Sequence, residues 1–151
     1  METTERKKRK IFADGPIAPA MIADSIAKHS TKTTIGGHDI FLGQVRADVM
    51  DGKNVVAIEY TTDEELADKV MYEIREAVFS KYNLTCLHVH HSLGRVNAGE
   101  LCLFVFASSP HRTDAIEGCR FVVEEIKAKL PVWGKEIFVD NSYTWKQNTP
   151  A

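Results

Sequence analysis

Residues 101–106 read Leu-Cys-Leu-Phe-Val-Phe, an apolar run with no polar interruption. The run is bounded by the turn sequence at residues 97–99, Asn-Ala-Gly, and by the serine pair that begins at Ser108. A short apolar run between such boundaries predicts a buried β-strand, here over residues 100–108. The segments around this strand decide which class of fold can bury it.

Two long helices are predicted from apolar residues that recur at helical spacing. The first covers residues 63–82, and its acidic start at Asp63 suits the positive end of a helix dipole. The second covers residues 111–129, with Ser109 as its N-cap and Pro131 as its stop. The expected buried stripes are Leu66, Val70, Ile74 and Val78 in the first helix, and Ala115, Ile116, Cys119, Val122, Val123, Ile126 and Leu130 in the second.

The other elements are predicted to be shorter. Residues 18–28 fit a short amphipathic helix, and the Asp51-Gly52 turn joins strands at residues 38–46 and 54–60. Further strands are expected at residues 85–93 and 132–139. Two long helices among hairpin-linked antiparallel strands indicate a single α+β domain.

The length of 151 residues suits one domain, expected at residues 11–140, between a basic tail at 1–10 and a C-terminal tail at 141–151. The tail at 1–10 carries five basic and two acidic residues, a net charge of +3, while the whole chain is at −2. This balance argues against a dedicated nucleic-acid binder. Neither a membrane span nor an apolar signal region is evident, so we expect a cytoplasmic protein.

The three cysteines are expected to be reduced, because they are odd in number and form no Cys-x-x-Cys pair. Cys102 and Cys119 fall among apolar residues and are expected in the core, as is Trp133. His88 and His90 share one face of a predicted strand but show no nearby third ligand. Neither a metal nor another cofactor is therefore expected.

Two segments could carry chemistry. Residues 108–112, Ser-Ser-Pro-His-Arg, lie where a buried strand turns into a helix, and free N–H groups there can bind an anion beside His111 and Arg112. Ordinary helix capping is the alternative. Lys127 flanks the apolar stripe of the second long helix. In that position it can be a partly desolvated lysine whose lowered pKa suits nucleophilic chemistry. The alternative is a solvated surface lysine.

Several motifs together resemble the large, catalytic subunit of molybdopterin synthase. Residues 43–46, Gly-Gln-Val-Arg, look like the Gly-x-Val-Arg strand end of that family, and residues 91–94, His-Ser-Leu-Gly, are similar to its His-Arg-x-Gly. The family has a His-Arg pair, which this chain matches at His111-Arg112. Its next motif is Lys-x-x-x-Pro-Ile-Trp-Lys-Lys-Glu, and residues 127–136 of this chain read Lys-Ala-Lys-Leu-Pro-Val-Trp-Gly-Lys-Glu. Residues 144–148, Thr-Trp-Lys-Gln-Asn, resemble its C-terminal Trp-Lys-x-Asn.

The resemblance implies an α/β hammerhead fold and a sulfurtransferase of molybdenum-cofactor synthesis. In that family a small ubiquitin-like subunit carries a C-terminal thiocarboxylate and gives its sulfur to cyclic pyranopterin monophosphate, which forms the molybdopterin dithiolene. The family assembles as a heterotetramer around a homodimer of large subunits. By position, Lys127 matches the catalytic lysine, and Arg46, His111 and Arg112 match residues that bind the substrate anion.

One departure from the family pattern concerns the second lysine. The family has a lysine directly after the tryptophan, where this chain has Gly134, and Lys135 matches the next family lysine. Side chains alternate along a strand, so Lys135 should face the other way unless Gly134 permits a bulge. Either Lys135 acts as a second catalytic lysine, or the chain is a weakened or non-catalytic scaffold for the small subunit. A phosphate-binding or RNA-contacting module is a further alternative.

Helix geometry adds one expectation. His111 and Lys127 are 16 residues apart on one predicted helix, which is about 24 Å at about 1.5 Å per residue. One small substrate cannot touch both residues of the same chain. We therefore expect a composite site, in which His111 and Arg112 of one protomer face Lys127 of another across a two-fold interface.

Overall fold

The strands form an eight-stranded sheet in a computed structural model that describes residues 11–146. The basic run at residues 1–10 and residues 147–151 lie outside the described part of the chain. The strands are β1 (Phe12–Asp14), β2 (Gly37–Gln44), β3 (Val49–Met50), β4 (Lys53–Thr62), β5 (Cys86–Asn97), β6 (Leu101–Ser109), β7 (Val132–Phe138) and β8 (Tyr143–Trp145).

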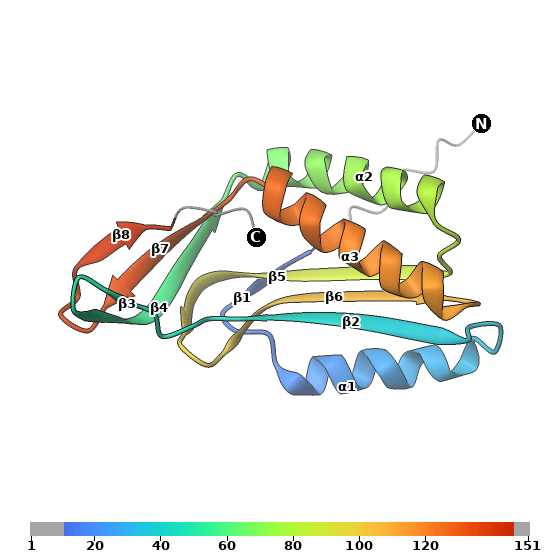
Figure 1. Cartoon of the computed structure of the whole chain (residues 1–151), viewed down its shortest axis with the longest axis horizontal. Helices are drawn as coiled ribbons and strands as arrows, with labels where there is room; N and C mark the ends of the chain where they lie inside the picture. The colour runs from blue at the N-terminus through green and yellow to red at the C-terminus, as the bar shows by residue number, and fades with distance from the viewer. Residues whose placement is uncertain (1–10, 147–151) are drawn as a thin grey trace.

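The main path of the sheet runs β2-β6-β5-β4-β7-β8 with antiparallel neighbours, while β1 pairs in parallel with β5 and β3 pairs with β4. Strand β5 links two parts of the sheet, since Cys86–His91 pair with β6 and Gly94–Asn97 pair with β4. Gly94 has a φ of +78°, which an L side chain rarely adopts, at the point where the pairing changes. The β4, β7 and β8 strands therefore extend away from the body of the molecule (Figure 1).

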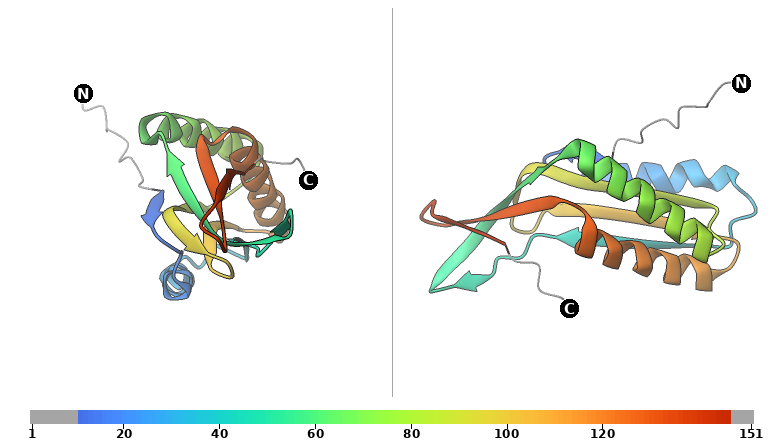
Figure 2. Two further views of the ribbon diagram at one scale, coloured as in Figure 1. Left: turned by 90° about the vertical axis from the view of Figure 1, so that its left-hand side faces the viewer. Right: turned by 90° about the horizontal axis from the view of Figure 1, so that it is seen from above.

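Helices lie on both faces of the sheet. Helices α2 (Glu64–Lys81) and α3 (Arg112–Lys129) lie side by side over one face, and α1 (Pro19–Lys28) with the 3₁₀ turn η1 (His29–Thr31) lies on the other (Figures 1 and 2). The main core packs α2 and α3 against the sheet, and a smaller core of Ile17, Phe104 and Phe106 lies toward α1. The predicted α+β class with hairpin-linked antiparallel strands and two long helices is confirmed.

The start of α2 follows the expected capping chemistry. The Asp63 carboxylate accepts a hydrogen bond of 3.1 Å from the backbone N–H of Leu66, and two glutamates follow in the first turn. The predicted stripe is partly wrong, because Leu66 is 47% exposed. Residues spaced by four are offset by about 40° around a helix at each step, so the predicted series that starts at Leu66 does not stay on one face. The face that is buried consists of Ala67, Met71, Ile74 and Val78.

The start of α3 differs from the prediction. His111, not Ser109, is the N-cap residue, and the Ser109 hydroxyl donates to the His111 carbonyl instead of capping an N–H group. Ile116 is 49% exposed, whereas Gly118 is buried because it packs against Leu84. The rest of the α3 stripe is buried as expected.

The end of the chain contains a strand that the sequence did not predict. β8 pairs antiparallel with β7, within the segment expected to be a C-terminal tail. β5 also continues past the predicted end of its strand, to Asn97. Cys102 and Cys119 are buried in the main core as expected. None of the helices between residues 11 and 146 has the length and apolar character that crossing a membrane requires.

Candidate functional site

A pocket of about 200 Å³ lies where α3 ends and β7 begins. Its walls come from four separate segments of the chain: the junction itself, β4, β5 and the residue that follows β8. The lining residues are Tyr60, His91, Ile126, Lys127, Ala128, Lys129, Leu130, Pro131, Val132, Trp133, Gly134 and Lys146.

The junction is held by local backbone chemistry. Pro131 disfavours helical geometry at the residue before it, and the C-cap Leu130 is accordingly extended, with φ −69° and ψ 123°. The Thr62 hydroxyl donates a hydrogen bond of 2.8 Å to the Pro131 carbonyl. Pairing of Tyr60 with Gly134 then aligns β4 and β7. These contacts place Lys127, in the last turn of α3, at the pocket wall.

The environment of Lys127 lowers the pKa of its ammonium. Desolvation of the ammonium is the largest cause, even though the residue as a whole is exposed, and the nearby charge of Lys146 acts in the same direction. The Cys102 side chain opposes the shift. A lysine with a lowered pKa holds more neutral amine near neutral pH than a free lysine does, and the neutral amine is the nucleophilic form.

His91 and Tyr60 form a neutral polar wall beside Lys127. Burial lowers the pKa of His91 to about 4, a backbone hydrogen bond opposes this, and Lys127 adds to it. The His91 Nδ1 atom lies 2.7 Å from the Ser92 carbonyl, so Nδ1 carries the proton and Nε2 is the acceptor. The Tyr60 ring packs edge-on to His91 at 5.1 Å between centroids. Burial, together with Cys102 and Glu136, raises the pKa of Tyr60.

Lys146 contributes a second cation to the pocket. Its backbone N–H donates a hydrogen bond of 2.7 Å to the Gly134 carbonyl, which fixes the residue after β8 alongside β7. A Cβ on Gly134 would lie 3.1 Å from Ile58 Cγ2, 3.4 Å from Tyr60 Cε1 and 3.7 Å from Lys146 Cβ. The Gly134 position, which lacks a side chain, therefore lies next to the lysine that follows β8.

Lys135 lies outside the pocket lining. The pairing of β4 with β7 runs from Tyr60–Gly134 to Glu59–Lys135 without a register shift, so no bulge turns Lys135 toward Lys127. Its ammonium lies 4.2 Å from the centroid of the Tyr143 ring. Trp133, expected in the core, is 51% exposed at the pocket. Neighbouring side chains on a strand point in opposite directions, so Lys135 points away from the side of Gly134 on which Tyr60 and Lys146 lie.

The three expected anion-binding residues are exposed. Arg46 follows β2, and its guanidinium lies 3.3 Å from the Asp48 carboxylate. His111 and Arg112 lie at the start of α3, whereas Lys127 lies in its last turn. From Arg112 to Lys127 the helix spans about 22 Å at about 1.5 Å per residue. Within one chain, the structure therefore does not bring Arg112 and Lys127 together.

The match to a family model decides the family of this chain. The model described as "MoaE protein" matches residues 14–129, more than three quarters of the sequence. The chain belongs to the MoaE protein family. This membership confirms the resemblance on which the site residues were chosen.

Relatives of this MoaE family member are named molybdopterin synthase catalytic subunits. The chain is 38% identical over 120 residues to a molybdopterin synthase catalytic subunit of Oryza sativa subsp. indica, covering 80% of this chain and 61% of the rice protein. It is 36% identical over 116 residues to molybdopterin synthase catalytic subunit 1 of Aedes aegypti, covering 75% of this chain and 74% of the mosquito protein. The chain thus spans less than two thirds of the rice relative.

Solved structures share the fold. Molybdopterin synthase from Staphylococcus aureus matches with a TM-score of 0.78 and 25% identity, covering 90% of this chain and 95% of that one. A complex of subunits 1 and 2 of molybdopterin-converting factor from Helicobacter pylori contains a chain with a TM-score of 0.77 and 18% identity, covering 90% of this chain and 88% of that one. The second likeness concerns the fold alone.

Sequence reasoning did not assign a role to Tyr60, His91 or Lys146. His91 and Lys146 both fall inside motifs that carried the family resemblance, and that was the available signal for them. Tyr60 lies at the predicted end of a strand with no motif around it. Its approach to Lys127 depends on the pairing of β4 with β7, which local sequence does not specify.

Proposed function

We propose that the chain is the large, catalytic subunit of a cytoplasmic molybdopterin synthase. It would transfer sulfur from the C-terminal thiocarboxylate of a small ubiquitin-like subunit to cyclic pyranopterin monophosphate. Family membership, and relatives named molybdopterin synthase catalytic subunit, support this assignment. The single observation that carries it is the pocket in which a partly desolvated Lys127 faces His91, Tyr60 and Lys146.

The chemistry of the reaction suits these side chains. In each transfer the C–S bond of the thiocarboxylate breaks, and a new C–S bond replaces a C–O bond of the pterin side chain, whose oxygen leaves as water or stays on the phosphate. The acyl carbon takes oxygen from water to become a carboxylate. Lys127 would meet the acyl carbonyl, either polarising it as an ammonium or capturing the acyl carbon as an amine. The neutral His91 has an acceptor at Nε2 and would orient a bound group by accepting a hydrogen bond there, while the proton that Lys127 releases goes to solvent.

Lys146 supplies the second pocket cation in this proposal, in place of Lys135. Its charge reaches Lys127 strongly enough to lower the pKa of that lysine, and its Cβ lies next to the empty side-chain position of Gly134. A glycine at residue 134 is then compatible with catalysis. This removes the main reason for preferring a non-catalytic scaffold.

The substrate phosphate would be held by Arg46, His111 and Arg112. Because α3 separates Arg112 from Lys127 by about 22 Å, we propose that the working site is shared between two copies of the chain within a heterotetramer. The small subunit would insert its C-terminal tail toward Lys127. The Helicobacter pylori neighbour, described as a complex of subunits 1 and 2, supports a two-subunit assembly of this kind.

Reconstitution tests the proposed function. The full chain is mixed with a thiocarboxylated small subunit and cyclic pyranopterin monophosphate, and dithiolene formation is measured. We expect product that depends on both the chain and the thiocarboxylate, with a carboxylate-ended small subunit as the matched control. The proposal fails if no product forms while an active large subunit of another species works with the same reagents.

A further inference from the structure

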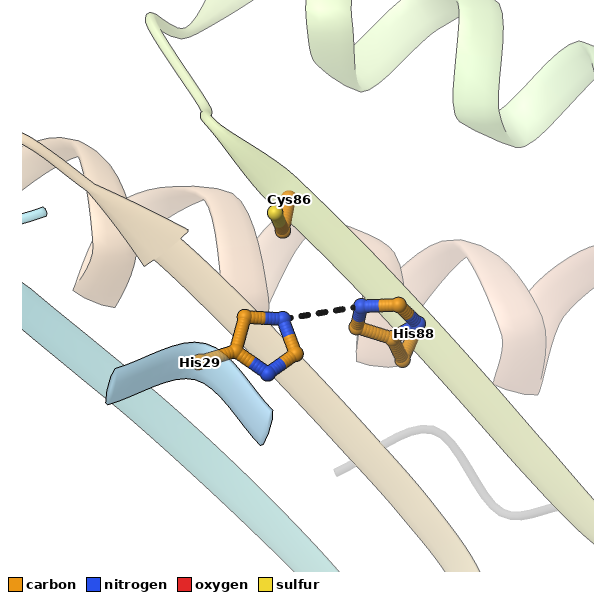
Figure 3. Close-up of side chains that lie close together, drawn as sticks. All are labelled: His29, Cys86 and His88. Atoms are coloured by element: carbon orange, nitrogen blue, oxygen red, sulfur yellow. Dashed lines mark hydrogen bonds between the residues drawn. The ribbon is translucent and has the colours of Figure 1, made fainter. Parts of the chain in front are cut away.

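Three potential metal ligands meet on the face of the sheet that lies toward α1. His29 comes from η1, and Cys86 and His88 come from β5, 57 to 59 residues further along the chain (Figure 3). The sequence suggested His88 and His90 as a pair, but His90 stacks on Phe104 at 5.9 Å between ring centroids. The companions of His88 are instead Cys86, two residues before it on β5, and His29, which the fold brings to the strand.

The separations between the ligand atoms suit a small metal ion. The two Nε2 atoms of His29 and His88 lie 3.0 Å apart, and all three ligand atoms lie within 4.8 Å of one another. A tetrahedral zinc ion, bonded at about 2.0–2.1 Å to nitrogen and 2.3 Å to sulfur, needs donor atoms roughly 3.3–3.6 Å apart. The widest pair must therefore close by roughly 1 Å, which side-chain rotation can supply.

His29 is oriented as a metal-binding imidazole. Its Nδ1 lies 2.6 Å from the Ser25 carbonyl, a contact in which Nδ1 donates its proton and Nε2 presents a lone pair toward His88. Metal-bound histidines generally donate their second ring N–H to a carbonyl or carboxylate, which fixes the ring and its tautomer. His29 is also 7% exposed, so its ring is held by the surrounding packing.

Lys32 is the group that competes for the sulfur. Its ammonium lies 2.9 Å from Cys86 Sγ, and its positive charge there repels a metal ion. The Lys32 residue is exposed, whereas Cys86 is 8% exposed. The ammonium can therefore move into solvent, and its departure leaves a position from which water can complete the coordination of an ion.

We propose that His29, Cys86 and His88 bind a thiophilic ion with tetrahedral geometry, of which Zn²⁺ is the natural example. On binding, the Cys86 thiol releases its proton to solvent. His88, whose Nε2–H donates to His29 Nε2 before binding, moves its ring proton to Nδ1 through solvent, so that Nε2 can bind the ion. The ion would join η1 to β5 and so fasten α1, none of whose residues is buried, to the sheet. The site lies on the opposite face of β5 from His91, so it is independent of the proposed sulfur transfer.

Cobalt titration of the full chain, after chelator treatment and dialysis, tests the proposal. Co²⁺ is a spectroscopic substitute for Zn²⁺, and a thiolate ligand gives a charge-transfer band in the near ultraviolet. We expect one equivalent to produce this band together with the d–d absorption of tetrahedral Co²⁺, and Zn²⁺ to displace both. Zn²⁺ should also raise the melting temperature of the apoprotein, because a ligand that binds only the folded state stabilises it.

Matched variants identify the ligands. Cys86→Ser should abolish the charge-transfer band, and His29→Gln or His88→Gln should weaken Zn²⁺ binding by at least tenfold. Cys119→Ser and His90→Gln are the controls and should bind like the parent, while Lys32→Ala should bind more tightly. Circular dichroism of each apoprotein separates loss of a ligand from loss of the fold. The proposal is overturned if no tetrahedral cobalt spectrum appears, or if folded Cys86→Ser keeps the band.

Discussion

A Cβ atom on Gly134 would lie 3.7 Å from the Cβ of Lys146, so a strand near the end of the chain brings a lysine to a position where β7 has no side chain. The backbone of Lys146 is joined to that of Gly134 by a hydrogen bond of 2.7 Å. The neighbouring Lys135 contacts Tyr143 instead of the pocket. The two lysines can therefore be separated by experiment.

The first prediction contrasts these two lysines. Lys146→Ala should reduce the rate of dithiolene formation by roughly tenfold or more, because it removes a pocket cation worth about 1.4 kcal/mol or more in transition-state stabilisation. Lys135→Ala should change the rate by less than threefold. Single-turnover assays with the thiocarboxylated partner measure both. If Lys135→Ala reduces the rate more than Lys146→Ala does, Lys135 and not Lys146 is the second catalytic lysine.

The second prediction concerns the protonation of Lys127. Lys127→Ala should reduce the rate by roughly 100-fold or more, and Lys127→Arg should not restore it if a neutral amine is required. If Lys127 acts as the amine, the rate should rise with pH and level off below the ordinary lysine value of 10.5, because burial and Lys146 lower the pKa of Lys127. Lys146→Ala should move this inflection to higher pH. A profile unaffected by Lys146→Ala would contradict the coupling.

The third prediction tests whether the site is shared. Lys127→Ala and Arg112→Ala chains, each with low activity, are mixed and allowed to exchange protomers. Random pairing should give mixed dimers with one intact site, and therefore up to about a quarter of the parental activity. Mixtures of each variant with itself are the controls. If exchange is demonstrated and activity does not exceed either parent, each chain must work alone.

The sequence predicted the elements better than it predicted the pocket. Helical spacing located α2 and α3, and the apolar run located β6, because these signals are local. Lys127 was found through its helix position and a motif. His91, Tyr60 and Lys146 meet Lys127 only through long-range pairing of β4, β5, β7 and β8. The spacing of residues within a strand does not indicate which distant strands become its neighbours.

The same limit applies to the metal-ligand cluster. The sequence places His88 on a strand, but its alternating histidines indicate His90 as the companion. His29 joins Cys86 and His88 because the chain after α1 folds back onto the sheet, a contact between residues almost 60 positions apart. A single histidine in a short turn, such as His29 in η1, gives no local sequence pattern that indicates a metal ligand.

The last prediction follows from the burial of His91. Its pKa of about 4 in the folded chain lies below the ordinary value of 6.5, so between these pH values the unfolded chain binds a proton that the folded chain does not. Stability should therefore fall as the pH decreases from about 6.5 to about 4, and this contribution should change no further below that. A shift of this size corresponds to about 3 kcal/mol.

Urea unfolding at a series of pH values measures this contribution. His91→Gln should flatten the dependence of the unfolding free energy on pH by about 3 kcal/mol across that window, whatever its effect on stability at neutral pH. His111→Gln, at an exposed histidine, is the matched control and should keep the parental slope. Since the charge of Lys127 adds to the shift, Lys127→Ala should flatten the slope in part. An unchanged slope in His91→Gln would show that His91 titrates alike in the folded and unfolded chains.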